Sequence, residues 1–364
     1  MPQTTAYLPT IYSLPRPTAV PLPPPLPAPV AVSSATPLNF EQVRQNLASQ
    51  GLLLGTNKIG FHVGMGGNTT DLDSWMRDLD AAGVPIFLKS ADNAEPIYHA
   101  QELMRQSGVP HVLVYRRTGA EYDVPNYNLP PQQAAAEHWA RHTAVFPPEL
   151  DKNLVWLETM NEVDKNRTTW LAIFAYETAQ LALRDGYKWA AFGWASGEPE
   201  PYHWEGHAML RFLELVGQHP TRLAISLHEY SYATENIRNI YPYLVGRFQF
   251  LFQTCDKYGL PRPTVLITEW GWDAEDVPEP TAALEDIRWA ARLYSAYPQV
   301  QGAAIWYLGG GYGEIANQAQ KLILPVRDYS QRHYFAVTPG RGRIEMGLFA
   351  DGTSDWGLEA TNDE

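Results

Sequence analysis

The sequence has few or none of several features that define other classes of protein. Cysteine occurs once in 364 residues, at Cys255, which excludes an internal disulfide and any metal site built from several cysteines. No run of about 18 or more apolar residues occurs, so we expect no membrane-spanning helix. Basic residues are outnumbered, because 27 Lys and Arg face 40 Asp and Glu and leave a net charge of −13. A surface this negative repels phosphate backbones, and we therefore expect no nucleic-acid partner.

The N-terminus carries no recognisable secretion signal. A signal peptide needs a basic start, an apolar run and a small-residue cleavage site, and residues 1–14 contain neither a basic residue nor such a run. The sequence leaves three interpretations open: a cytoplasmic protein, a secreted or cell-surface protein whose signal has been removed, and export by another route. The oligomeric state is open as well.

Proline is concentrated at the beginning of the chain, where residues 1–37 hold 11 of the 30 prolines. Because proline lacks an N–H group and fixes φ, this segment is not expected to form a helix or a central strand. We expect an extended tail or linker over residues 1–40, either without function or as a tether to a partner. A single barrel domain is expected over residues 41–340 and a C-terminal tail over residues 341–364.

From about residue 55, short apolar runs typical of β-strands alternate with longer amphipathic runs typical of α-helices. The expected strands cover residues 59–64, 84–90, 110–116, 153–161, 187–194, 222–230, 263–270 and 300–308. The expected helices cover residues 71–82, 95–107, 131–143, 168–185, 206–218, 235–258 and 281–296. Strict alternation favours parallel strands joined by right-handed crossovers, and eight units over about 270 residues match a closed (β/α)8 TIM barrel of the α/β class.

An open, doubly wound sheet is the alternative fold. It requires a glycine-rich turn after the first strand, and the glycines of residues 64–68 do not form the G-x-G-x-x-G pattern of such folds. We therefore favour the barrel, with residues 310–364 closing its bottom or wrapping its outside.

Polar and aromatic residues stand at the ends of four expected strands. In TIM barrels these ends form the active site. The residues concerned are Asn161 and Glu162 after the fourth strand, His228 and Tyr230 on the sixth, Glu269 on the seventh and Trp306 on the eighth. Two carboxyl groups facing each other across the barrel mouth suit cleavage of a glycosidic bond, because one can protonate the leaving oxygen while the other attacks carbon or activates water. Aromatic faces offer stacking surfaces to sugar rings.

The acid of such a pair has to keep its proton near neutral pH. We expect burial beside a second negative charge to raise its pKa enough for this.

This set of residues resembles clan A of the glycoside hydrolases, a group of retaining enzymes that includes cellulases, β-xylosidases and mannanases. The resemblance spans about residues 55–310. It is carried by the Asn161-Glu162 dipeptide, the His-x-Tyr of residues 228–230, Glu269 and Trp306, in this order and each at a strand end. It implies a TIM barrel that binds a glycan substrate, with no cofactor.

The resemblance also implies a role for each residue. Glu162 would be the general acid/base and Glu269 the nucleophile, with their carboxyl groups about 5–5.5 Å apart. Asn161 would bond to the 2-hydroxyl of the sugar, and Tyr230 would donate a hydrogen bond to Glu269. His228 would contact the substrate or a carboxylate, and Trp306 would form the floor of the subsite for the cleaved sugar.

Two features depart from the clan pattern, and one is that Tyr115-Arg116 replaces a histidine often found at the end of the third strand. Many members place an arginine at the end of the second strand to pair with the nucleophile, whereas this strand carries Lys89, so that either Lys89 or Arg116 on the third strand would supply the positive charge. Further tryptophans are candidates for additional sugar subsites, and about half are expected only to pack: Trp194, Trp204, Trp270 and Trp272.

Two other glutamates are expected to be structural. Since side chains alternate along a strand, Glu158 should lie on the face opposite Asn161 and pair with a basic residue between strand and helix. Glu229 should point away from the barrel interior if its neighbours His228 and Tyr230 point into it.

Metal and serine chemistry lack their usual patterns. His62 stands alone on the first strand, and neither the His-Glu-x-x-His nor the Gly-x-Ser-x-Gly pattern occurs, so we expect no metal site and no serine hydrolase.

The hypothesis is a retaining β-glycosidase acting on an oligo- or polysaccharide. The alternatives are a carbohydrate-binding barrel without catalysis and an inverting hydrolase. The sugar, its linkage and endo or exo action are left open.

Overall fold

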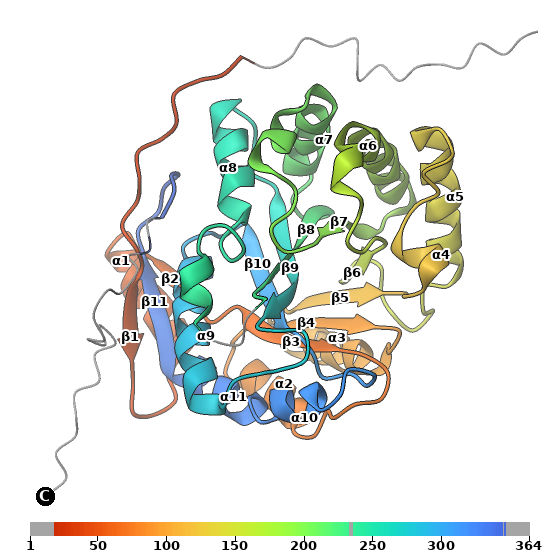
Figure 1. The fold of residues 1–364 in the computed structure, drawn as a ribbon. Helices are drawn as coiled ribbons and strands as arrows, with labels where there is room; N and C mark the ends of the chain where they lie inside the picture. Colours follow the sequence, from red (N-terminus) through yellow and green to blue (C-terminus); the bar gives the residue numbers. More distant parts are fainter. Residues whose placement is uncertain (1–17, 233–235, 345, 347–364) are drawn as a thin grey trace, which may run out of the picture.

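The computed structural model describes residues 18–232, 236–344 and 346 (Figure 1). Eight parallel strands close into a barrel in chain order, and the last strand pairs with the first. The strands are β3 (Ile59–Val63), β4 (Phe87–Ala91), β5 (Val112–Arg116), β6 (Val155–Glu158), β7 (Lys188–Trp194), β8 (Leu223–Tyr230), β9 (Thr264–Gly271) and β10 (Val300–Ile305). The prediction of a (β/α)8 barrel is confirmed.

Seven longer helices connect the strands on the outside of the barrel. They are α2 (Leu72–Ala81), α3 (Glu95–Ser107), α5 (Pro131–Ala144), α6 (Thr168–Asp185), α7 (His207–Gln218), α8 (Phe248–Lys257) and α9 (Pro280–Ser295). One expected helix was too long: residues 237–240 form a 3-10 turn, and α8 begins only at Phe248, because Pro242 and the left-handed Gly246 interrupt the pattern. Among the described residues, none of the helices combines the length and apolar composition needed to cross a membrane.

A small antiparallel sheet lies beside the barrel and was not predicted. Its order is β1 (Val30–Ser33), β11 (His333–Val337) and β2 (Leu53–Gly55), and Figure 1 shows it next to α1 (Phe40–Ser49) and α9. β1 belongs to the proline-rich segment and occupies an edge of the sheet, where proline is tolerated in the flanking chain. Two helices after β10, α10 (Ile315–Gln320) and α11 (Ile323–Arg332), lead to β11. Residues 1–17 and 347–364 of the two expected tails lie outside the described residues.

The inside of the barrel is built in layers. The lower layer is apolar and consists of Phe87, Val112, Val114, Trp156, Ala190, Ala224, Leu266 and Ala304. Side chains two residues further along a strand return to the same face. On β4, β6, β8 and β9 these next inward positions are polar and buried, namely Lys89, Glu158, Ser226 and Thr268. The change from apolar to polar filling places a polar floor under the C-terminal mouth of the barrel.

Gly60 on β3 occupies a position with no room for a side chain. A Cβ atom at this position would lie 1.8 Å from the backbone oxygen of Phe87 on β4. Because a backbone oxygen cannot rotate away, we expect Gly60→Ala to lower the free energy of unfolding by about 3 kcal/mol or more, which urea denaturation would measure. Gly206→Ala is the matched control, since its nearest neighbour would lie 3.6 Å away. Equal losses in both variants would contradict this account of strand packing.

Candidate active site

A cavity of about 680 Å³ opens at the C-terminal ends of the barrel strands. It brings together seven of the residues singled out from the sequence: Arg116, Asn161, Glu162, Tyr230, Glu269, Trp272 and Trp306. Lys89 and His228 lie buried beside it without lining it, and Trp194 and Trp270 do not line it. Residues separated by up to 190 positions, from Arg116 to Trp306, therefore share one pocket.

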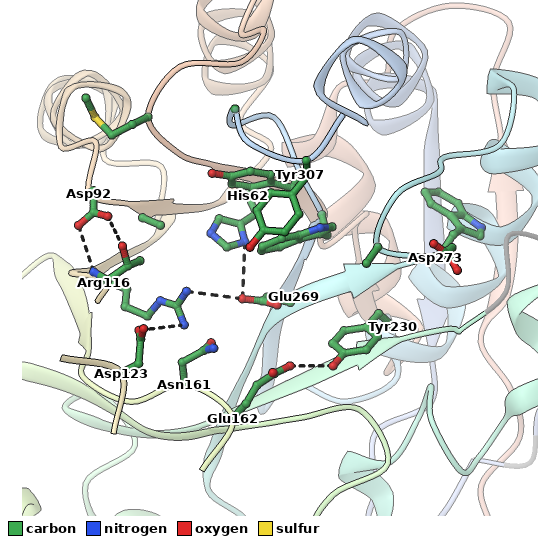
Figure 2. Close-up of a pocket in the computed structure, with 18 of the residues that line it drawn as sticks. His62, Asp92, Arg116, Asp123, Asn161, Glu162, Tyr230, Glu269, Asp273 and Tyr307 are labelled. Carbon is green, nitrogen blue, oxygen red and sulfur yellow. Dashed lines mark hydrogen bonds and ion pairs between the residues drawn. The ribbon is translucent and has the colours of Figure 1, made fainter. Parts of the chain in front are cut away.

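The two carboxylates face each other inside this pocket (Figure 2). Glu269 is part of β9, and Glu162 follows the end of β6 by four residues. One oxygen of each carboxylate lies within 4.8 Å of one of the other, and the Nδ1 atom of His228 lies 3.4 Å from an oxygen of each. Two acids at this separation can act on a single atom of a bound molecule from neighbouring directions.

An irregularity in β9 aims Glu269 into the pocket. Leu227 of β8 pairs with Ile267, but the next residue, His228, pairs with Glu269, so that Thr268 is an extra residue in β9. Such a β-bulge interrupts the alternation of side chains and re-aims one of them. Both Thr268 and Glu269 consequently reach the barrel interior, where Thr268 bonds to Glu158 and Glu269 lines the cavity.

The Glu269 carboxylate is surrounded by nitrogen groups from four strands. Its oxygens lie 3.3 Å from Lys89 Nζ, 3.4 Å from His228 Nδ1, 3.9 Å from an Arg116 Nη atom and 4.0 Å from His62 Nδ1. Its side chain is only 8% exposed. Removing a carboxylate from water is costly unless positive charge or hydrogen bonds replace the solvent, and here both basic residues considered from the sequence contribute.

Glu162 is held differently, on a loop with an unusual backbone. Its φ of 45° lies in the left-handed region, which costs a residue with a Cβ atom some strain. Its N–H group donates to the carbonyl of Gly193 at 2.7 Å, and Gly193 is itself left-handed and close to Met160. The loop thereby turns the Glu162 side chain into the pocket, where it remains 42% exposed.

Two expectations about this acid were wrong. Tyr230 was expected to donate to Glu269, but its hydroxyl donates to Glu162 Oε1 at 2.7 Å. Glu162 was expected to keep its proton through burial, but it is partly exposed, and the interaction with His228, helped by Tyr230, lowers its pKa to about 2. Donors aimed at a carboxylate favour its ionised form, which is why the shift has this direction.

Asn161 and Trp306 offer polar and apolar contacts to a ligand. The Oδ1 atom of Asn161 is buried and has no hydrogen-bond partner among the described residues, while its backbone N–H group donates to Asp123. The half-buried ring of Trp306 stacks on Tyr307 at 4.3 Å and meets the edge of Tyr312 at 5.2 Å. These rings form an aromatic wall beside the two acids.

Trp194 and Trp270 were wrongly expected in sugar subsites. Both are fully buried. Trp194 packs against Phe192 and Trp204, and Trp270 packs against Trp272. Of the four tryptophans considered, Trp272 alone lines the cavity.

Glu158 does not pair between strand and helix as expected. The strand β6 ends at Glu158, so the alternation used in the prediction does not extend to Asn161. Its carboxylate points into the barrel and lies 2.8 Å from Lys89 Nζ. Glu229 does point outward, where it accepts hydrogen bonds from the backbone of Gly246 and Phe248, and burial raises its pKa to about 7.

Several pocket residues were missed by sequence reasoning. His62 lies at the end of β3, where the rule used for the other strands applies equally, but it was considered only as a metal ligand. Burial, with Lys89 and Arg116 nearby, lowers the pKa of His62. Asp92, Asp123 and Tyr307 also line the cavity, from segments that follow strands and carry no recognisable pattern.

Comparison with known proteins adds little beyond the fold. No family model matches the chain, and no curated protein matches it. A triple mutant of an endo-β-1,4-glucanase from Xanthomonas axonopodis pv. citri is 16% identical, with 76% of this chain and 99% of that chain covered at a TM-score of 0.46. A family 5 xyloglucanase from Paenibacillus pabuli is 14% identical, with 76% and 99% covered at a TM-score of 0.41.

An aldolase from Escherichia coli K12 is similar too, at 10% identity, 81% and 98% coverage and a TM-score of 0.35. The three similar structures are thus a glucanase, a xyloglucanase and an aldolase by their descriptions. At these identities the likeness concerns the fold alone, and the function has to be argued from the site of this chain.

The hydrogen bond from Tyr230 provides a test of the site electrostatics. Because it stabilises the ionised Glu162, Tyr230→Phe should raise the pKa of Glu162 by about one to two units, since a hydrogen bond to a charged group contributes about 1.5–3 kcal/mol. A titration of the carboxyl carbon of Glu162 by NMR would measure the change. Tyr232→Phe is the matched control, because its hydroxyl donates to the carbonyl of Ser196 and not to an acid. An unchanged titration in Tyr230→Phe would contradict the arrangement.

Proposed function

We propose that this chain is a retaining β-glycosidase that cleaves an oligo- or polysaccharide by double displacement. The observation that supports this most directly is the approach of the Glu162 and Glu269 carboxylates to within 4.8 Å in an aromatic-walled cavity. Retaining glycosidases use carboxyl groups about 5–5.5 Å apart, whereas inverting enzymes need roughly 6.5–9.5 Å to admit a water molecule. This bound on the nearest oxygen atoms of the two carboxylates is consistent with the shorter separation and supports the retaining mechanism.

The surroundings of the two acids differ in a way that assigns their roles. Glu269 lies within β9, is almost fully buried and is within reach of Lys89 and Arg116, as suits a nucleophile that has to be ionised. Glu162 is the more exposed acid on a loop at the open side of the pocket, where a leaving group and an incoming water molecule can both reach it. We therefore assign Glu269 as the nucleophile and Glu162 as the acid/base.

The reaction then proceeds in two displacement steps. A carboxylate oxygen of Glu269 attacks the anomeric carbon, the bond from that carbon to the leaving oxygen breaks, and Glu162 gives its proton to that oxygen. Glu162 next takes a proton from a water molecule, whose oxygen attacks the anomeric carbon and releases the Glu269 carboxylate. Asn161 Oδ1, which is unpartnered in the described structure, would accept a hydrogen bond from the 2-hydroxyl, and Trp306 would lie under the sugar ring.

The low pKa of Glu162 has a consequence for the first step, which requires its proton. In the free protein this carboxyl is ionised above about pH 2. A bound sugar covers the exposed part of the side chain and removes its water, which raises the pKa of a carboxyl. The fraction of Glu162 that carries a proton is therefore larger in the complex than in the free protein. Activity should be highest at acidic pH, because an acid catalyst loses its proton as the pH rises through its pKa.

Covalent trapping tests the role of Glu269. A panel of activated 2-deoxy-2-fluoro glycosides should label the wild-type protein once, because the first step proceeds while the second is slowed. Peptide mass spectrometry should place the sugar on Glu269, and Glu269→Gln should give no adduct. A protein that binds glycans but forms no adduct and cleaves none would be a carbohydrate-binding barrel instead.

Leaving-group dependence tests the role of Glu162. For Glu162→Ala we expect turnover of a natural glycan to fall by about 10²–10⁴-fold, the usual contribution of acid catalysis, while an aryl glycoside with an acidic leaving group is cleaved with a much smaller loss. Glu137→Ala on the exposed face of α5 is the control and should resemble the wild type on both substrates. Equal losses on both substrates would remove Glu162 from the acid role.

A further inference from the structure

A third carboxylate lies beneath the cavity and has no part in the mechanism described above. Glu158, the last residue of β6, is fully buried and does not line the pocket. Its Oε1 atom accepts hydrogen bonds from the hydroxyls of Thr268, at 2.7 Å, and Ser226. Its Oε2 atom lies 2.8 Å from Lys89 Nζ. Each oxygen of this buried acid therefore has a polar neighbour.

Lys89 connects this acid with Glu269. Its ammonium group lies 2.8 Å from Glu158 and donates to Glu269 Oε1 at 3.3 Å. The side chains of Lys89 and Glu158 have no exposed surface, and that of Glu269 is 8% exposed. A single buried cation is thus shared by two buried carboxylates, in a place where water cannot compensate either of them.

We propose that Glu158 is a positioning residue, which holds Lys89 in place against Glu269 and takes a share of its positive charge. This inference rests on the proposed role of Glu269 as the nucleophile. The long, flexible lysine side chain would otherwise have a choice of positions, whereas a short ion pair to a fixed carboxylate leaves it one. Because the positive charge of Lys89 is shared with Glu158, it binds the Glu269 carboxylate less strongly. The Glu269 carboxylate thereby remains a good nucleophile.

The partners of Glu158 tie it to the strands that carry the site. Thr268 directly precedes Glu269 through the bulge of β9, and Ser226 precedes His228 by two residues on β8. Glu158 therefore joins β4, β6, β8 and β9 at one point below the cavity. The charged and titratable groups that face Glu269 come from every surrounding element of the site: His62 on β3, Lys89 on β4, Arg116 on β5, Glu162 after β6, His228 and Tyr230 on β8, and Tyr307 after β10.

The variant Glu158→Gln tests this role with little change of shape. Glutamine keeps an oxygen that accepts from Thr268 and Ser226 but removes the negative charge, so that Lys89 acts on Glu269 alone. We expect the acidic limb of kcat/KM, which reports ionisation of the free enzyme, to move to lower pH by about one unit. We also expect kcat to fall roughly tenfold with KM nearly unchanged, because an altered ammonium position affects the reacting carboxylate rather than sugar binding.

A second variant should move the acidic limb of kcat/KM in the opposite direction. Lys89→Met alone leaves Glu158 buried without its cation and is prone to unfold. The double variant Lys89→Met/Glu158→Gln removes both charges and keeps the packing volume. Since Glu269 then loses its nearest cation, the acidic limb should move to higher pH. A purely structural role for Glu158 would leave the limb in place in Glu158→Gln, while the double variant would still shift it through the loss of Lys89.

Glu229→Gln is the matched control, because it makes the same substitution at another fully buried glutamate that bonds to the backbone of Gly246 and Phe248. We expect Glu229→Gln to lower the free energy of unfolding and to leave the acidic limb of kcat/KM unchanged. A folded Glu158→Gln variant with the kcat and acidic limb of the wild type would overturn the inference.

An NMR titration of the Glu269 carboxyl carbon in the same variants needs no turnover. It separates this inference from the proposed function. A shifted titration in a protein that cleaves no glycoside would sink the glycosidase assignment, but it would support the sharing of Lys89. Covalent labelling of Glu269 together with an unshifted titration would support the glycosidase assignment and overturn the sharing of Lys89.

Discussion

The burial of the Glu269 carboxylate is the constraint on which the site depends. A carboxylate with so little contact with water requires compensating groups, and they come from His62, Lys89, Arg116 and His228 on four different strands. These residues are separated by up to 166 positions, from His62 to His228, and meet only when the barrel is closed. The site therefore requires the closed barrel, with its polar layer directly on the apolar filling.

The second acid is governed by the opposite conditions. Glu162 lies outside the regular strand, its backbone is left-handed, and its side chain keeps contact with solvent while His228 and Tyr230 lie against it. Solvent contact permits the proton exchange that the proposed acid/base role needs, and the two neighbours hold the direction of the carboxylate. Two chemically identical side chains thus obtain different properties from a strand interior and from a loop.

Much of this could be predicted from the sequence, because eight alternating strand–helix units without a dinucleotide-binding glycine pattern favour a barrel, and the strand ends of a barrel indicate where the site lies. Glu162, Glu269 and Asn161 were found in this way. The hydrogen-bond partner of Tyr230 was not predicted correctly. The bulge at Thr268 and the loop of Glu162 arise from packing between strands, and no sequence pattern indicates them. The side sheet pairs Val30 with Ala336 across about 300 residues, and no local pattern predicts such a contact.

The charged layer itself argues for function rather than stability. Phe87, Val114 and Trp156 show that the barrel interior can be filled by apolar side chains, and two residues further along β4 and β6 the filling becomes Lys89 and Glu158. Replacing a buried ion pair by apolar residues is often neutral or stabilising by about 1–4 kcal/mol. A fold optimised for stability alone would therefore continue its apolar layer upward. The ion pair directly under Glu269 instead places a buried positive charge 3.3 Å from a carboxylate that has little contact with water.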